Sequence, residues 1–244
     1  MDVLSYDMTE SFRYNHHNLE LTMSKKMIGL SFDDACNTQR HFAVPLIQNL
    51  GFGATFFVCE FWDAFHTNHQ QYMTWQEIKE IQDMGFEIGN HTLTHSQAVK
   101  DMTEEEFLVE LRALNKVAKL HGVTGMTGFG YPGGPAVADF DVKGCLRREG
   151  FRYARAVGPQ PYVPGESDIY ELPCFPVNAP DLAPLQQAVA TAGDNAFPIL
   201  VYHGVPDLLH PWAGTPEEVF KAGMEWLAQQ DCQVVALRDL PGLG

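Results

Sequence analysis

The chain has 244 residues, of which 45% are hydrophobic, a composition typical of a globular domain with a buried core. Its 31 acidic residues outnumber its 16 lysines and arginines, which gives a formal net charge of -15. Such a surface repels phosphate backbones and anionic lipid headgroups, so it argues against nucleic acid and membrane partners and favours a neutral or cationic ligand.

The cysteines and the N-terminal segment narrow the class of protein further. The five cysteines are odd in number, widely spaced and without a C-x-x-C pair, so neither a disulfide framework nor a cysteine zinc site is expected. Residues 1–26 are polar and mixed in charge, and they lack the basic and apolar regions of a signal peptide. We therefore expect an N-terminal extension over residues 1–26 and a cytoplasmic protein.

Apolar runs and amphipathic stretches alternate along residues 27–244. The runs predict strands at residues 27–32, 54–59, 85–89, 126–130, 152–157, 197–202 and 233–236. The amphipathic stretches predict helices at residues 38–49, 74–84, 103–120, 137–149, 181–192 and 216–229. Residues 60–72 are expected to form a loop, and the proline-rich residues 158–180 a long connection with one or two short strands near 169–175. This order predicts one parallel α/β domain, with a barrel as the favoured arrangement.

Four groups of polar residues or turns follow predicted strands. They are Asp33-Asp34, His91 with His95, Tyr131-Pro132-Gly133-Gly134, and His203. In a barrel the carboxyl ends of the strands share one face, so these groups are expected to meet in one pocket. Each group by itself also has a structural explanation: acids that end a strand, a capped helix start, a tight turn and a core histidine.

The acids and the histidine pair have the donors of a metal site. Two histidines four residues apart converge on one ion when they lie on a helical turn. One carboxylate and two imidazoles leave coordination positions open for water and substrate, as in a catalytic site. Zinc is the first choice for these donors, and Fe2+, Co2+, Ni2+ or Mn2+ are alternatives.

Taken together, the motifs resemble those of the polysaccharide deacetylase family, the NodB homology domain of carbohydrate esterase family 4. Ser31-Phe32-Asp33-Asp34 and His91-Thr92-Leu93-Thr94-His95 are similar to its first two motifs. Phe129-Gly130-Tyr131-Pro132-Gly133-Gly134 is similar to the third, and Leu200-Val201-Tyr202-His203 to the fifth. The resemblance implies a distorted (β/α)-barrel over residues 27–244 and metal-assisted hydrolysis of an N- or O-acetyl group.

The resemblance also implies a role for each matching residue. Asp34, His91 and His95 are expected to bind the metal, and Asp33 to act as the general base that takes a proton from water. His203 is expected to protonate the departing amine or alcohol.

Two further roles concern the acyl group of the substrate. The backbone N–H of Gly133 is expected to stabilise the oxyanion. Leu200 and Tyr202 are expected to line the acyl pocket.

Two departures from the family pattern affect the general base. The family commonly has an arginine in the third motif, where this chain has Gly130, and no stretch matches the aspartate–tryptophan pattern of the fourth motif. Arg155 is a candidate replacement, because a guanidinium can clamp a carboxylate from another strand. A surface arginine at a strand end is the alternative interpretation.

The leading hypothesis is a metal-dependent enzyme that removes acetyl groups from an N- or O-acetylated carbohydrate. One alternative is hydrolysis of a linear or cyclic amide, such as an imide or a ureide, at the same site. The other is a sugar-binding pseudoenzyme that keeps the fold. The joint presence of two acids and three histidines favours an enzyme over a binding module.

Overall fold

The computed structural model describes residues 26–134 and 137–244, so nearly all of the expected N-terminal extension, residues 1–26, lies outside the described residues. The strands are β1 (Lys26–Asp33), β2 (Thr55–Val58), β3 (Glu87–Asn90), β4 (Gly128–Gly130), β5 (Tyr153–Arg155), β6 (Phe175–Pro176), β7 (Ile199–Tyr202) and β8 (Cys232–Val235). The α-helices are α1 (Val44–Asn49), α2 (Trp62–Thr67), α3 (Trp75–Asp83), α4 (Glu104–Leu120), α5 (Val142–Arg148), α6 (Ala183–Val189) and α7 (Glu217–Leu227). A π-helical turn, η1 (Gln39–Ala43), precedes α1, and two 3-10 turns are η2 (Val99–Asp101) and η3 (Leu237–Asp239).

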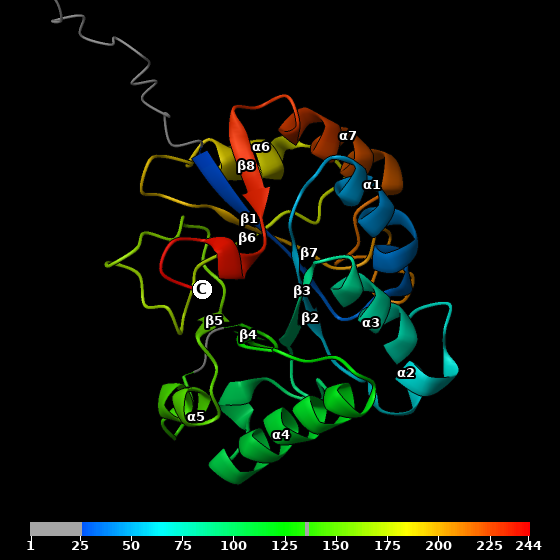
Figure 1. The fold of residues 1–244 in the computed structure, drawn as a ribbon, viewed down its shortest axis with the longest axis vertical. Helices are drawn as coiled ribbons and strands as arrows, with labels where there is room; N and C mark the ends of the chain where they lie inside the picture. Colours follow the sequence, from blue (N-terminus) through cyan, green and yellow to red (C-terminus); the bar gives the residue numbers. More distant parts are fainter. Residues whose placement is uncertain (1–25, 135–136) are drawn as a thin grey trace, which may run out of the picture.

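The strands form one curled sheet with helices on its outside (Figure 1). Their order is β5-β4-β3-β2-β1-β7-β6, β8 pairs with the first half of β1, and every strand pair is parallel. Parallel pairing brings the carboxyl ends of the strands to one rim. The register shows this directly, since Ser31 near the end of β1 lies beside both Thr55 and Val201.

The proline-rich connection closes the gap between the outermost strands, β5 and β6. Leu172 donates its backbone N–H to the carbonyl of Ala154 at 2.8 Å, and Gly158 forms an antiparallel bridge with Cys174. The same segment continues into β6, which pairs with β7. An irregular stretch therefore takes the place of a regular strand, and the predicted distorted (β/α)-barrel is confirmed.

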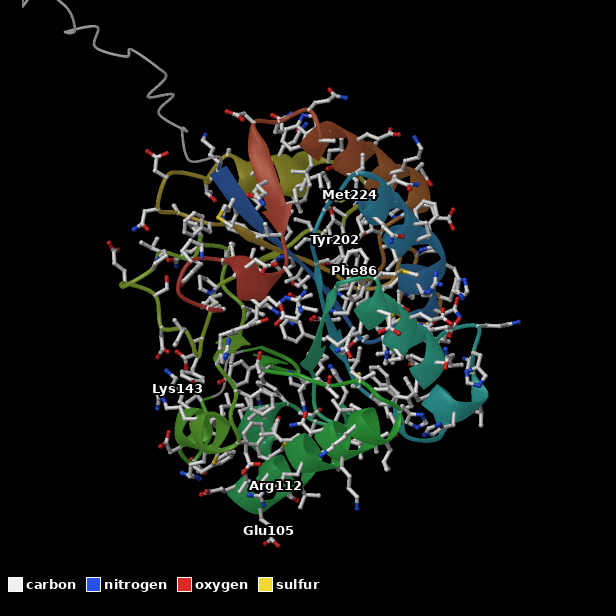
Figure 2. All side chains as sticks on the ribbon, viewed as in Figure 1. Phe86, Glu105, Arg112, Lys143, Tyr202 and Met224 are labelled. Atoms are coloured by element: carbon white, nitrogen blue, oxygen red, sulfur yellow. The ribbon has the colours of Figure 1, made fainter. Side chains whose placement is uncertain are left out.

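The sheet has one face toward the helices and one toward the barrel interior. Phe32 and Tyr202 pack with Phe220 of α7 in the helix-facing layer, and Figure 2 shows Tyr202, Phe86 and Met224 within this part of the molecule. Phe57 and Tyr153 belong to the interior cluster. The two layers follow from the period-two alternation of side chains along each strand.

Most predicted elements are found, and the differences have local causes. Thr74 and Thr103 each cap a helix in a capping box, as their sequence patterns predict. The predicted loop at residues 60–72 contains the short helix α2. The predicted helix at 137–149 begins only at Val142, because the Asp141 side chain accepts the Gly144 N–H and sets its N-cap. Among the described residues, no helix has both the length and the apolar character needed to cross a membrane.

Candidate active site

Two adjacent acids stand at the carboxyl end of β1. Asp33 is the last residue of the strand, and Asp34 and Ala35 follow with positive φ angles of 75° and 49°. This left-handed backbone is costly for residues other than glycine and is often found where function requires it. Both carboxylates approach the same imidazole: Nε2 of His91 lies 3.9 Å from Asp33 Oδ2 and 3.5 Å from Asp34 Oδ1.

The histidine pair follows β3 in a loop, so of the two predicted settings, a loop or a helix start, the structure has the loop. Thr92 and His95 have positive φ angles of 64° and 46°, and these fold the loop so that the two rings lie 4.8 Å apart. The side chain of Asn90 accepts the Thr92 N–H at 2.9 Å. Glu110 of α4 accepts both the N–H and the hydroxyl of Thr94, at 2.8 and 3.0 Å. These bonds hold the unusual backbone that brings the imidazoles together.

Asp34, His91 and His95 have the geometry of a metal site. Their donor atoms all lie within 4.8 Å of one another, and Oδ1 of Asp34 is 3.5 Å from His91 Nε2 and 3.7 Å from His95 Nε2. Oδ1 of Asp34 is also buried without a hydrogen-bond partner among the described residues. A buried carboxylate oxygen without a donor is costly unless a cation or water satisfies it.

The protonation of His91 suits a metal ligand. Its Nδ1–H donates to the carbonyl of Gly130 at 2.7 Å, which leaves the Nε2 lone pair facing Asp34. Burial lowers the pKa of His91 to about 4, so the ring is neutral at pH 7. A neutral imidazole whose second nitrogen is fixed by a hydrogen bond is the usual form of a metal-bound histidine. The three residues therefore fit a divalent metal ion.

Arg155 reaches Asp33 from the other side of the pocket. Its Nη2 lies 2.7 and 2.6 Å from the two oxygens of Asp33, and both residues are buried. The interpretation of Arg155 as a surface residue is therefore wrong. Burial by itself raises the pKa of Asp33, but the charge and the hydrogen bonds of the adjacent Arg155 guanidinium are the main influences that outweigh it and lower the pKa below its usual value. Asp33 is thus held as a carboxylate.

Gly130 makes room for this arginine. It is the register partner of Arg155 on the neighbouring strand. A Cβ atom at Gly130 would lie 2.9 Å from Arg155 Nη2 and 2.9 Å from Cγ of Phe57. The glycine at the position of the family's arginine and the arginine on β5 are therefore two parts of one arrangement.

His203 lies on the remaining side of Asp33, directly after β7. Its Nε2 is 3.9 Å from Asp33 Oδ2, and its Nδ1 has no hydrogen-bond partner in the described part of the chain. Gln39 joins the two strand ends, because its Nε2 donates to the carbonyls of Asp33 at 2.5 Å and His203 at 3.1 Å. No motif singles out Gln39, which lies in a helical stretch among other polar residues.

The two predictions about the acyl group have different outcomes. Gly133 lies in the turn after β4 with φ +70°, and its role toward an oxyanion stays a prediction. Leu200 and Tyr202 are buried on the helix-facing side of the sheet, so the prediction that they line an acyl pocket is wrong. Val201, between them, faces the barrel interior.

Comparisons with known proteins identify the family of the chain. A family model described as polysaccharide deacetylase matches residues 20–154, more than half of the chain. The fifth motif, at residues 200–203, lies beyond the matched part. A search of curated proteins found no match.

Several solved structures share the fold. Peptidoglycan deacetylase PdaC from Bacillus subtilis is 16% identical, with 89% of this chain and 90% of that chain covered and a TM-score of 0.57. A family 4 carbohydrate esterase from Streptomyces lividans, in complex with acetate, is 15% identical, with 89% and 95% covered and a TM-score of 0.60. A CE4 family pseudoenzyme from Bacillus anthracis is 19% identical, with 89% and 66% covered and a TM-score of 0.60. By its motifs, its fold and the family model, this chain belongs to the polysaccharide deacetylase family.

Proposed function

We propose that this protein is a metal-dependent hydrolase that removes acetyl groups from an N- or O-acetylated carbohydrate. The observation that carries the proposal is the convergence of two kinds of group in one pocket. Asp34, His91 and His95 form a compact donor set, and beside it Asp33 lies between Arg155 and His203. Family membership supports deacetylation as the reaction.

The metal would be held by Asp34, His91 and His95. A divalent ion there, with zinc as the first choice, supplies Lewis acid chemistry: it lowers the pKa of water toward ~7 and polarises a carbonyl oxygen. The donor set of one carboxylate and two imidazoles leaves positions open for that chemistry.

Asp33 is placed to act as the general base. Its pKa is lowered, chiefly because the charge and hydrogen bonds of Arg155 outweigh the effect of burial, so it is ionised and can accept a proton from the attacking water. Arg155 binds both oxygens of Asp33 through one nitrogen. This contact fixes the direction of the carboxylate, and a general base works only when it lies within hydrogen-bond reach of its proton.

His203 is placed to act as the general acid. Its Nε2 lies 3.9 Å from Asp33 Oδ2, and a quarter of its side chain is exposed to solvent. As water adds to the acetyl carbon and the C–N or C–O bond breaks, His203 donates a proton to the departing amine or alcohol. The products are acetate and the deacetylated sugar.

The pseudoenzyme alternative has one argument in its favour, the missing arginine of the third motif, and a CE4 relative from Bacillus anthracis is described as a pseudoenzyme. The contact between Arg155 and Asp33 answers that argument, because the general base has a guanidinium partner from β5. The metal donor set, the proposed general base and the proposed general acid also lie close together. We therefore favour turnover over binding alone.

The test combines metal analysis with acetate release. The purified protein is stripped with a chelator, reloaded with zinc or cobalt, and assayed on acetylated chito-oligosaccharides, peptidoglycan fragments and acetylxylan. We expect acetate release that needs added metal. The variant Asp33→Asn should keep the metal and lose turnover, whereas the control Asp194→Asn, at an exposed position, should behave as wild type. No acetate from any of these substrates, with metal bound, would contradict the proposal.

A further inference from the structure

The loop that follows His203 is closed and tightly built. The backbone N–H of Thr215 donates to the carbonyl of Gly204 at 3.1 Å and joins the two ends of the loop. The Asp207 side chain lies fully buried at its centre and accepts the N–H groups of Leu209 and His210 at 3.0 and 2.8 Å. These bonds give residues 204–215 a fixed shape.

One contact from outside the loop, and close backbone packing within it, add to this support. Nε2 of Gln71 donates to Asp207 at 2.8 Å. Gly204 and Gly214 pass so close to Asp207 that a Cβ atom on either would lie 2.4 or 2.7 Å from its backbone. Side chains on the outside of this loop are thus presented by a rigid backbone.

Those side chains are apolar and exposed. Among the described residues eight large hydrophobic side chains are exposed. Three of them, Leu208, Leu209 and Trp212, belong to five consecutive residues of this loop. Trp212 is 76% exposed. Clusters of this kind on a protein surface mark binding sites more often than single exposed residues do.

A row of rings connects Trp212 with the metal site. The ring of His95 lies 5.2 Å from that of Phe61, which lies 6.4 Å from His210, which in turn lies 5.4 Å from Trp212. His95 and His210 are each partly open to solvent. The exposed indole is therefore linked to the metal site through three successive ring contacts.

We propose that Trp212 is a stacking subsite for a further sugar ring, beyond the acetylated one, so that the substrate is an oligosaccharide rather than a monosaccharide or a small cyclic amide. This inference rests on the proposed function, which places the acetylated ring at Asp33 and Asp34. A pyranose presents a face of C–H groups, and an indole ring offers a large rigid apolar surface that loses little conformational entropy on binding.

The absence of charged side chains from this part of the loop favours a neutral sugar over a phospholipid surface or a nucleic acid as the partner. Residues 208–214 contain no lysine, arginine, aspartate or glutamate. A phospholipid surface or a nucleic acid would require cationic side chains at this place. A neutral oligosaccharide requires none.

The test compares substrates of different length. We expect wild type to have a higher kcat/KM on the N-acetylglucosamine tetramer than on the monosaccharide. Trp212→Ala should lower this tetramer-to-monomer ratio about five- to tenfold, and Trp212→Phe should retain most of it. The control is Leu120→Ala, since Leu120 is also 76% exposed but ends helix α4. A ratio unchanged in Trp212→Ala, or a loss shared equally by both substrates, overturns the proposal.

A binding measurement separates this inference from the proposed function. The metal-free protein is titrated with the same tetramer and followed by NMR and calorimetry. Weaker tetramer binding by Trp212→Ala supports the subsite even where no acetate is released, in which case the proposed function alone fails. Equal binding by wild type and Trp212→Ala overturns the subsite. The subsite is also overturned if the molecular mass of wild type in solution rises with protein concentration and Trp212→Ala abolishes this rise, because the surface would then join two copies of the chain.

Discussion

Nη2 of Arg155 lies 2.7 and 2.6 Å from the two oxygens of Asp33, inside the barrel and away from solvent. The guanidinium also lies over the ring of Phe57, at 5.1 Å from its centroid. This ion pair spans strands β5 and β1, which are far apart in the sheet order. It therefore fixes the general base from the opposite wall of the barrel.

Arg155→Lys should misplace the carboxylate of Asp33 while keeping a positive charge beside it. A lysine keeps the positive charge but lacks the planar guanidinium, so we expect kcat to fall about 100-fold through misplacement of the base. Arg155→Ala leaves a buried carboxylate without its partner and should lower the free energy of unfolding by about 3–5 kcal/mol. Steady-state kinetics and urea unfolding measure the two effects. Arg112→Ala, which breaks an exposed ion pair with Glu149, is the control. If Arg112→Ala lowered kcat and the free energy of unfolding as much as Arg155→Ala does, a special role for Arg155 would be contradicted.

Gly130→Ala should damage the same contact without touching either charge. The new Cβ would lie 2.9 Å from Arg155 Nη2 and from Phe57 Cγ, closer than such atoms approach, so the guanidinium must shift. The Cβ would also lie 3.1 Å from Nδ1 of the proposed ligand His91, so we expect kcat to fall and zinc affinity, measured by competition with a chelator, to fall to a smaller extent. Gly150→Ala is the matched control for a glycine-to-alanine change, because a Cβ there meets no atom within 4 Å, although its φ of +85° makes a cost in stability expected. Normal turnover in Gly130→Ala would show that Arg155 needs no such space.

Metal binding should stabilise the fold through the three expected ligands. A ligand that binds only the native state raises the free energy of unfolding by RT ln(1 + [L]/Kd), about 2.7 kcal/mol at 100 times Kd. We expect zinc to raise Tm of the wild type, and Asp34→Asn or His95→Ala to lose most of this rise. Thermal unfolding with and without zinc, together with calorimetric titration, measures it. His69→Ala controls for loss of a histidine, and a rise retained in His95→Ala would exclude that residue as a ligand.

The polar groups of the site were predictable because of a general property of parallel sheets. Asp33 and His203 each end an apolar run, and parallel strands bring such ends to one rim. The sequence also suggested Arg155, but its burial depends on the register between Gly130 and Arg155. That register joins two strands of only three residues, which is too short for a sequence pattern to define.

The remaining features had no local signal. Thr92 and His95 adopt left-handed backbone that is unfavourable for their residue types. The bond from the Thr92 N–H to Asn90 is local, but the support from Glu110 of α4 exists only in the folded chain. Tyr202 was placed on the wrong face because a continuously apolar strand carries no alternation that would show which side faces the helices.

Glu87 gives a prediction about stability and pH that is independent of the site. It is buried at the start of β3, where it accepts the Thr55 hydroxyl at 2.6 Å and the Arg238 N–H at 3.1 Å. Burial raises its pKa, and these hydrogen bonds offset only part of the effect. A pKa that is higher in the folded than in the unfolded state favours folding when the group is protonated. The stability it contributes is full below the unfolded pKa and is lost as pH rises through the folded pKa.

Glu87→Gln should therefore become more stabilising, relative to wild type, as the pH rises. The amide keeps an oxygen that can accept from Thr55 and Arg238 but carries no charge to bury. We expect the Tm of the variant to exceed that of wild type at pH 8, and this difference to shrink toward pH 4. Calorimetry across this range measures the difference, with Glu166→Gln at an exposed position as the control. A difference that stays constant with pH would mean that the Glu87 charge is already compensated in the folded protein, because only a change in its protonation on unfolding can give the two curves different slopes.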